Sequence, residues 1–399
     1  MKRAKSDAMR DILLHPYWIL FSLAGVFFFF FALNRGGVNV FFWSGGVFLL
    51  AHLAHGDYGI NTIPRYHLWL LGICASLVLM SLIFSYAHTD THRVFRIGKM
   101  LVIVFCIHFI SRTEAAQHAY TLLGVLLTVS IAWQFVVRSL FGLPYGTWSN
   151  PHYLANVSIL TLPLVFYYFR TAPKPYYFLF LLLFFMDIDP LFRNASRPAF
   201  LALFVSTLFV LTFFTRGRYR WIGLLSVSAC LLLLVVTNYG GFFDKLKELV
   251  ANAVDEERVH IWQYSLRMLQ DSSPADWLVG NGIGRSADLL PTYAIADPLY
   301  KDFNFPHNFL IQILFDNGII GAALVFGGLA FLLYLFIKLA RTVDDAPGHL
   351  FINCMMAIFL NWLIFTSLTV GFYSKYTLYP IGFIIGTLFV LAEEVPNGS

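Results

Sequence analysis

The sequence predicts an all-α membrane protein: a polytopic transmembrane helical bundle of about twelve spans with one long helical insertion. Two observations on composition support this prediction. Hydrophobic residues make up 58% of the 399 residues and charged residues only 12%, whereas a soluble domain carries roughly 25% charged residues. The third observation is that apolar runs recur along the chain, many of them near the roughly 20 residues that a helix needs to cross a bilayer. A surface with so little charge suits lipid and not water.

Twelve apolar runs qualify as candidate spans. They lie near residues 17–33, 38–54, 66–86, 95–111, 118–141, 153–170, 175–190, 198–215, 221–238, 308–337, 348–371 and 376–392. The first run follows basic residues and lacks a small-residue cleavage site, so we expect an uncleaved span and not a signal peptide. The run that begins at Asn308 is long, which predicts that it tilts or starts outside the bilayer.

The basic residues of the short loops predict the orientation. Cytoplasmic loops are enriched in Lys and Arg, and placing the N-terminus in the cytoplasm gives thirteen such residues inside and seven outside. The inside set is Lys2, Arg3, Lys5, Arg10, Arg65, Arg112, Arg170, Lys174, Arg216, Arg218, Arg220, Lys338 and Arg341. The outside set is Arg35, Arg93, Arg96, Lys99, Arg193, Arg197 and Lys375. We therefore expect both termini to be cytoplasmic.

This orientation divides the chain into three parts. Residues 1–238 hold spans one to nine, residues 239–306 form a helical insertion on the outer face, and residues 307–399 hold spans ten to twelve with a short cytoplasmic tail. The four cysteines all fall inside apolar runs, so a disulfide framework or a paired-cysteine metal site is not expected. No internal repeat is evident, which weakens a transporter built from inverted repeats.

The insertion contains a predicted helix that carries a candidate functional arginine. Residues 255–269 begin with acidic residues and have Arg267 near the end, as the helix dipole favours. Arg258 lies near the start of this helix. It can bind an anion, or it can form a surface salt bridge with the acidic residues beside it.

A second arginine precedes span eight. Ser196 can cap a helix whose first positions hold Arg197 and Pro198. A helix N-terminus attracts anions, and an arginine there suits a phosphate near the lipid headgroups. The alternative is an arginine that extends to the membrane interface without binding a ligand. Arg193 lies close by and could join the same anion site.

His307 is the histidine that lies where the insertion re-enters the membrane. It follows Pro306 and opens an apolar helix. An imidazole at that boundary can accept a proton near neutral pH, although most histidines in a chain with twelve have structural roles. With two arginines on the same face, it predicts a reaction on a lipid-linked phosphate, in which arginines stabilise a diphosphate leaving group.

A pair of carboxylates near the end of span seven offers a competing mechanism. Asp187 and Asp189 form a D-x-D pattern, and carboxylates of that kind can hold a divalent metal that bridges a diphosphate. The alternative, which we favour, is that Asp189 pairs with Arg193 or Arg197, or caps the helix end. We therefore expect no metal and no cofactor in the reaction.

Four stretches of the chain together resemble the O-antigen ligase and polymerase superfamily, in the order of that family. They cover roughly residues 146–321 and are Gly146 to Asn156, Asn194 to Leu203, Arg258 to Trp262 with Gly280 to Gly284, and Pro306 to Leu310 with Asp316 to Gly321. Each stretch alone is a weak signal. The combination, with a long insertion between the second and last stretches, is specific.

The resemblance implies an activity and residue roles. The family's ligase looks like a metal-independent, inverting membrane glycosyltransferase of the C type, which moves O-antigen from undecaprenyl diphosphate to lipid A–core oligosaccharide. It implies a Gram-negative inner membrane with the reaction on the periplasmic face, membrane lipid as a partner and no nucleic acid. Carried over by motif, Arg197 and Arg258, with Arg193 as a further candidate, hold the donor diphosphate. His307 is then the base, or orients the acceptor hydroxyl.

Several alternatives remain open at this point. An O-antigen polymerase uses the same donor but a lipid-linked glycan as acceptor, and protein O-oligosaccharyltransferases use Ser or Thr. A transporter of lipid-linked sugars would place charges at mid-membrane, whereas the notable charges here gather at one face. The glycan, the acceptor sugar and the oligomeric state are not predicted.

Overall fold

The computed structural model describes residues 65–112, 116–143, 151–194, 196–215, 217–238, 257–295, 305–343 and 346–394, with the short pieces 243–244, 247 and 303. The described residues form helices and no strand. This is what a bilayer requires, because a helix satisfies its backbone hydrogen bonds within its own segment. The predicted all-α class is confirmed for this part of the chain.

Ten of the predicted spans are observed as helices close to their expected positions. They are α4 (Arg65–Ser85), α5 (Thr91–Ser111), α6 (Ala116–Leu140), α7 (Pro151–Thr171), α8 (Tyr177–Asn194), α9 (Arg197–Phe213), α10 (Arg218–Thr237), α15 (Phe309–Thr342), α16 (Ala346–Thr369) and α17 (Lys375–Glu394). Short 3₁₀ turns lie at Tyr86–His88 and Lys174–Tyr176. The insertion contributes α12 (Glu257–Gln270), α13 (Pro274–Val279) and α14 (Arg285–Tyr293).

Seven helices of the described residues are long and apolar enough to cross a membrane: α4, α6, α7, α10, α15, α16 and α17. The other three observed helices, α5, α8 and α9, are not among these seven, and α9 is an apolar helix of only 17 residues. The predicted spans near 17–33 and 38–54 lie outside the described residues. The total of about twelve spans therefore stays a prediction.

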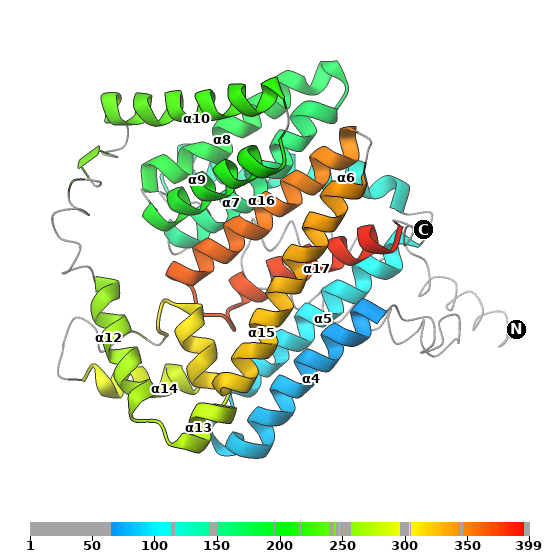
Figure 1. Ribbon diagram of the computed structural model, residues 1–399. Coiled ribbons are helices and arrows are strands. Elements are labelled where there is room, and N and C mark those ends of the chain that lie inside the picture. The colour runs from blue at the N-terminus through cyan, green and yellow to red at the C-terminus, as the bar shows by residue number, and fades with distance from the viewer. Residues whose placement is uncertain are drawn as a thin grey trace, which may run out of the picture.

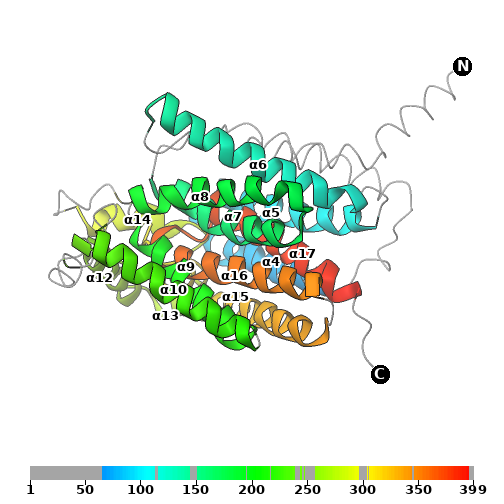
Figure 2. The same ribbon diagram turned by 90° about the horizontal axis from the view of Figure 1, so that it is seen from above.

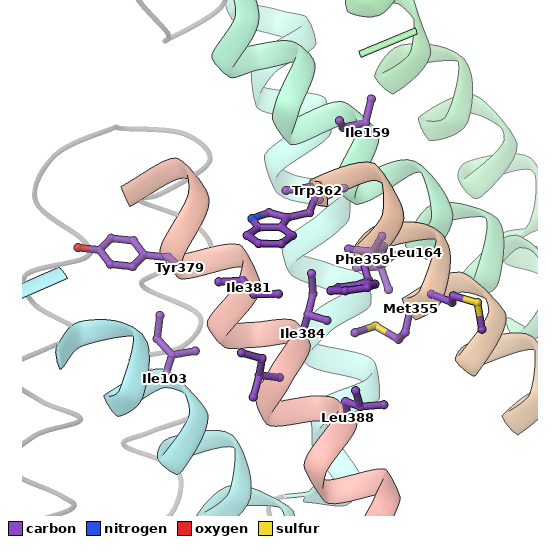
Figure 3. Close-up of a cluster of buried hydrophobic side chains, with 14 of the residues drawn as sticks. Ile103, Ile159, Leu164, Met355, Phe359, Trp362, Tyr379, Ile381, Ile384 and Leu388 are labelled. Carbon is purple, nitrogen blue, oxygen red and sulfur yellow. The ribbon is translucent and has the colours of Figure 1, made fainter. Parts of the chain in front are cut away.

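The helices pack into one bundle around α16. In Figure 2 they run in similar directions, with α6 along one edge, and α16 contacts α7, α9, α15 and α17. Side chains of α5, α7, α16 and α17 converge on a shared apolar centre that includes Trp362 and Phe359 (Figure 3). Because lipid tails are as apolar as these side chains, close packing and interhelical hydrogen bonds hold such a bundle together.

Polar contacts also connect the helices of this core. Asn361 of α16 donates to the Ile159 carbonyl of α7 at 2.7 Å and accepts from the Ser206 hydroxyl of α9 at 2.6 Å. The Trp362 indole donates to the Thr377 carbonyl of α17 at 2.8 Å. One short stretch of α16 therefore fixes three neighbouring helices.

The helix α15 is broken near its start. Gly318 has φ +66 and ψ −173, a non-helical conformation that separates a first segment from the long remainder. A β-carbon at Gly318 would lie 2.4 Å from the Leu278 carbonyl oxygen of the insertion. The length of this predicted span is thus explained by a break against which the insertion packs.

The insertion helices gather at one end of the bundle, in the lower left of Figure 1. Alternation of helix direction brings the first residues of α5, α7, α9, α15 and α17 to that same end. The first residues of α4 and the last residues of α17 lie at the other end, on the right of Figure 1. All three candidate site residues therefore lie at the end that carries the insertion.

Candidate functional site

His307 adopts a backbone conformation that non-glycine residues rarely take. Its φ is +52, in the left-handed region that costs an L-residue about 1 kcal/mol or more. It lies between the buried Pro306 and Asn308, the N-cap of α15. The Asn308 side chain accepts from the backbone N–H groups of Leu310 and Ile311 at 3.0 and 3.3 Å. The start of α15 thereby holds the histidine in place.

The hydrogen bond of the His307 ring determines its tautomer. Nδ1 lies 2.8 Å from the carbonyl oxygen of Thr369, the last residue of α16. A carbonyl can only accept, so Nδ1 carries the hydrogen and, in the neutral ring, Nε2 keeps the lone pair. The ring also packs against Phe305, with centroids 4.2 Å apart, and Phe303, at 5.3 Å. His307 thus presents an acceptor nitrogen in a fixed orientation.

The surroundings of His307 disfavour its charged form. Burial lowers its pKa from 6.5 to about 4, and the hydrogen bond to Thr369 opposes that shift by raising it. The charges of Arg258 and His152 lower the pKa further. The imidazole is therefore neutral at physiological pH. Arg258 of α12 and His152 of α7 therefore lie close enough to His307 to act on its charge.

His152 is a site residue that the sequence did not single out. It lies at the start of α7, half-buried, and its Nδ1 is 3.3 Å from the Ser196 hydroxyl. Ser196 immediately precedes Arg197, the first residue of α9. His152 therefore connects Arg197 to the pair of His307 and Arg258. The sequence signal that could have pointed to His152 is its position after Pro151, in one of the four stretches that resemble the superfamily.

The start of α9 differs in one detail from the prediction. Ser196 is the N-cap and Pro198 lies in the first turn, as expected, but the Ser196 hydroxyl makes no capping hydrogen bond to the helix. It contacts His152 instead. Arg197 is half-buried at this helix N-terminus, where the helix dipole favours an anion. The side chain of Arg193, near the end of α8, lies outside the described part.

Beside Ser196 and His152, the first turns of α5, α7 and α17 contact one another. The rings of Tyr153 and Tyr376 stack with centroids 3.9 Å apart. The Asn156 amide donates to the Tyr376 carbonyl at 3.1 Å, and the Arg96 guanidinium donates to the Tyr373 carbonyl at 3.0 Å. Arg96 adds a cation at the same end of the bundle.

The glycine-rich stretch after α13 pairs with the break in α15. The N–H groups of Asn281 and Gly282 donate to the carbonyls of Phe315 and Asp316, both at 3.0 Å. The buried Asp316 carboxylate accepts from the N–H groups of Gly284 and Ser286 at the start of α14, at 3.1 and 2.9 Å. Two of the quoted stretches are therefore one structural joint between the insertion and α15.

Gln312 extends this joint to the segment that follows α16. Its amide nitrogen donates to the Asp316 carboxylate at 3.3 Å, and its amide oxygen accepts from the Phe372 N–H at 2.6 Å. The Tyr373 hydroxyl also bonds the Asn317 side chain. Phe372 lies three residues after Thr369, which positions His307. The insertion is thus linked to the orientation of the histidine by a continuous set of contacts.

The two aspartates of the D-x-D pattern contact other helices. Asp189 forms an ion pair with Arg138 of α6 at 2.8 Å, and its pairing with Arg193 or Arg197 stays a prediction. Asp187 is buried and accepts from the Thr161 hydroxyl at 2.6 Å. The packing of α6 against α8 brings Arg138 to Asp189. Each carboxylate thus has a protein partner within the described residues.

An apolar cavity of about 360 Å³ lies between α12 and α15. Its lining residues are Leu266, Leu269, Leu310, Ile311, Leu314 and Phe326. The same two helices carry or adjoin Arg258 and His307. The site thus combines cations, a neutral imidazole and an adjacent apolar surface, which suits an anionic headgroup on a lipid chain.

The comparisons with known proteins agree with this chemistry. No curated protein matches this chain. A family model described as O-antigen ligase matches residues 178–326, a stretch that contains Arg197, Arg258 and His307. Proteins of this superfamily are membrane glycosyltransferase-like enzymes that act in cell-surface glycan assembly. Over these residues the chain is similar to the O-antigen ligase family.

Proposed function

We propose that this protein is an O-antigen ligase. It transfers O-antigen polysaccharide from undecaprenyl diphosphate to lipid A–core oligosaccharide, with inversion and without a metal, on the periplasmic face of the inner membrane. The observation that carries the proposal is the arrangement around His307, where a neutral imidazole with a fixed tautomer lies within the electrostatic influence of Arg258 and His152.

The reaction is one displacement at the anomeric carbon of the donor sugar. The acceptor hydroxyl oxygen forms the new C–O bond while the bond from that carbon to the diphosphate oxygen breaks. The diphosphate keeps the electron pair, and Arg197 and Arg258 stabilise its charge. The hydroxyl proton passes to Nε2 of His307, which has the lone pair because Nδ1–H is bonded to Thr369.

The low pKa of His307 connects base strength to donor binding. A base whose pKa is about 4 takes up a proton weakly. A bound diphosphate brings negative charge near the ring, which raises the pKa of His307. It also neutralises part of the charge of Arg258, which raises that pKa further. The imidazole therefore becomes a better base when the donor is in place.

The apolar cavity between α12 and α15 supports a lipid-linked donor. An isoprenoid chain needs an apolar surface that continues from its diphosphate site. Leu266 and Leu310, on helices that carry or adjoin Arg258 and His307, line such a surface. A soluble sugar nucleotide has no lipid chain that this apolar surface could bind.

The decisive experiment is reconstitution of the purified protein with lipid-linked O-antigen and one of two acceptors. Lipid A–core should become glycosylated, and a second lipid-linked glycan should not be extended. Extension of the lipid-linked glycan, without modification of lipid A–core, would make the protein a polymerase and overturn the ligase proposal. The phosphate-stabilising roles of Arg197 and Arg258 are common to both reactions.

A chelator tests the metal-free part of the mechanism separately. Transfer should continue in EDTA during a short assay of folded protein. Loss of activity that Mg²⁺ restores would overturn metal-free transfer, because Mg²⁺ is the ion that oxygen ligands and diphosphates hold.

A further inference from the structure

Three ionisable groups meet at the end of the bundle opposite the insertion. They are His67 near the start of α4, His108 near the end of α5 and Glu393 near the end of α17. Nδ1 of His67 lies 3.7 Å from Oε1 of Glu393, and Nδ1 of His108 lies 3.4 Å from Oε2. One ligand atom from each residue falls within 4.8 Å of the others. Helices distant in sequence therefore place two imidazoles around one carboxylate.

The burial of these histidines calls for a partner. His67 is 0% exposed and His108 is 2% exposed. Within the described residues, neither ring nitrogen of His67 nor Nδ1 of His108 has a hydrogen-bond partner. Buried polar atoms are almost always bonded, and an exception indicates a bound water or ion. The two rings also lie side by side, tilted by 58° with centroids 4.5 Å apart, an arrangement that is compatible with one shared ligand.

We propose that His67, His108 and Glu393 bind a divalent transition-metal ion, with Zn²⁺ as the best fit. Imidazole nitrogen and carboxylate oxygen are its usual protein ligands, and Mg²⁺ or Ca²⁺ would prefer oxygen alone. Ligands bound tetrahedrally at about 2.0–2.1 Å lie about 3.4 Å from each other. The observed separations of 3.4 and 3.7 Å go to the two different oxygens of Glu393, and the three ligand atoms lie within 4.8 Å of one another, so rotation of the side chains would complete that geometry.

The position of Arg112 supports the proposed metal site, and it also offers a competing explanation for the cluster. Its guanidinium lies 3.2 Å from Oε2 of Glu393 and is 43% exposed. A carboxylate that binds a metal commonly accepts a hydrogen bond from such a neighbour, which orients it. The competing explanation is an ion pair of Arg112 with Glu393 and no metal. That explanation leaves the buried nitrogens of His67 unbonded.

The proposed ion would hold the ends of three helices together. α5 and α17 already pack closely, since a β-carbon at Gly386 would lie 2.9 Å from the Ile107 side chain. Along α4, His67 lies eighteen residues from Ser85, which contacts the insertion, or roughly 27 Å at 1.5 Å per residue. The metal site is therefore remote from His307, and its role is structural. The inference stands independently of the proposed function.

Metal content of the full-length protein tests the proposal. The protein is purified in detergent without a polyhistidine tag, and its metals are measured by mass spectrometry. We expect about one Zn²⁺ per chain, retained by the His349→Ala control and lost in His108→Ala and Glu393→Gln. His349 starts α16 at the same end of the bundle and contacts Asn353, so this control removes a histidine outside the cluster.

Two further measurements keep the proposal falsifiable where a variant folds poorly. After chelation, added Zn²⁺ should raise the melting temperature of the wild-type protein, and Mg²⁺ should not. Added Co²⁺ should give visible absorption bands of a tetrahedral site, absent from Glu393→Gln, which retains the size of the side chain. A wild-type protein that binds neither ion overturns the proposal. So does a Glu393→Gln protein with unchanged metal content and Co²⁺ spectrum.

Discussion

At the scale of single residues, the conformation of His307 is the feature that most suggests function. A left-handed histidine persists only where its neighbours determine it. Here the N-cap at Asn308, the hydrogen bond to Thr369 and the rings of Phe303 and Phe305 do so. The same contacts fix the direction of Nε2.

Replacement of His307 tests its role in the chemistry. His307→Ala and His307→Asn should each reduce transfer by roughly 100- to 10,000-fold, the usual contribution of a general base. Asn tolerates the left-handed conformation, so His307→Asn should keep the wild-type melting temperature. His92→Ala, which removes an exposed histidine from the start of α5, should retain full activity. Wild-type transfer by the His307→Asn protein would remove His307 from the mechanism.

The pH dependence of transfer should report the low pKa of His307. The neutral base persists down to a pH near 4, so the acid limb of kcat/KM should lie below the ordinary histidine value of 6.5. Arg258→Gln removes a charge that lowers this pKa. Its acid limb should therefore move to higher pH, while Arg258→Lys keeps the limb low. An unchanged limb in Arg258→Gln would show that the titrating group is not His307.

Local sequence identified Arg197, Arg258 and His307 but not the way in which they are connected. His152 was quoted within a stretch and given no role, because nothing along the chain indicates that α7 begins beside Ser196. Local sequence likewise did not indicate that Asp189 would bond Arg138, which is fifty-one positions distant. Contacts of that range depend on helix packing, which hydropathy does not specify.

At the scale of elements, the joint between the insertion and α15 connects the site to the bundle. Gly280 has φ +88 and ψ 166, a conformation that is essentially restricted to glycine. A β-carbon there would lie 2.4 Å from the Cα atom of Asn317. The break at Gly318 and the turn at Gly280 thus allow two backbones to approach where any side chain would separate them.

Substitution of Gly280 should loosen this joint. Gly280→Ala combines a strained backbone with a steric overlap, and we expect a loss of about 2–4 kcal/mol of stability. Its melting temperature in detergent should fall, and protease cleavage within 257–295 should increase. Gly327→Ala in α15 is the control, because a β-carbon there would meet nothing within 4 Å. Equal melting temperatures for the two variants would contradict the joint.

Hydropathy predicted the positions of the helices well and their lengths across the membrane poorly. The periodic run at 255–269 correctly indicated α12. The break in α15 could not be predicted, because a glycine inside an apolar run usually remains helical. Only the approach of Leu278 and Gly280 makes Gly318 adopt φ +66. Those contacts join segments about forty residues apart.

At the scale of the whole molecule, the two ends of the bundle have different chemistry. The insertion end holds Arg258, His307 and the start of α9, and the opposite end holds the His67–His108–Glu393 cluster. Lys174 and Arg170 also lie at the opposite end, as does the last turn of α15. The positive-inside rule predicts that this opposite end faces the cytoplasm. On that prediction, the end with the proposed donor site faces the periplasm.

Cysteine labelling in a cysteine-free background tests this orientation. Asp288→Cys places a thiol on the exposed side of α14, and Lys174→Cys places one on the exposed turn before α8. A thiol reagent that cannot cross the inner membrane should label Asp288→Cys in spheroplasts, and Lys174→Cys only after lysis. Because α7 begins at the insertion end and ends just before Lys174, these two positions lie at opposite ends of the bundle. The reverse labelling would place His307 on the cytoplasmic side and exclude a periplasmic transfer reaction. It would leave the hydrogen bond between His307 and the Thr369 carbonyl unaffected.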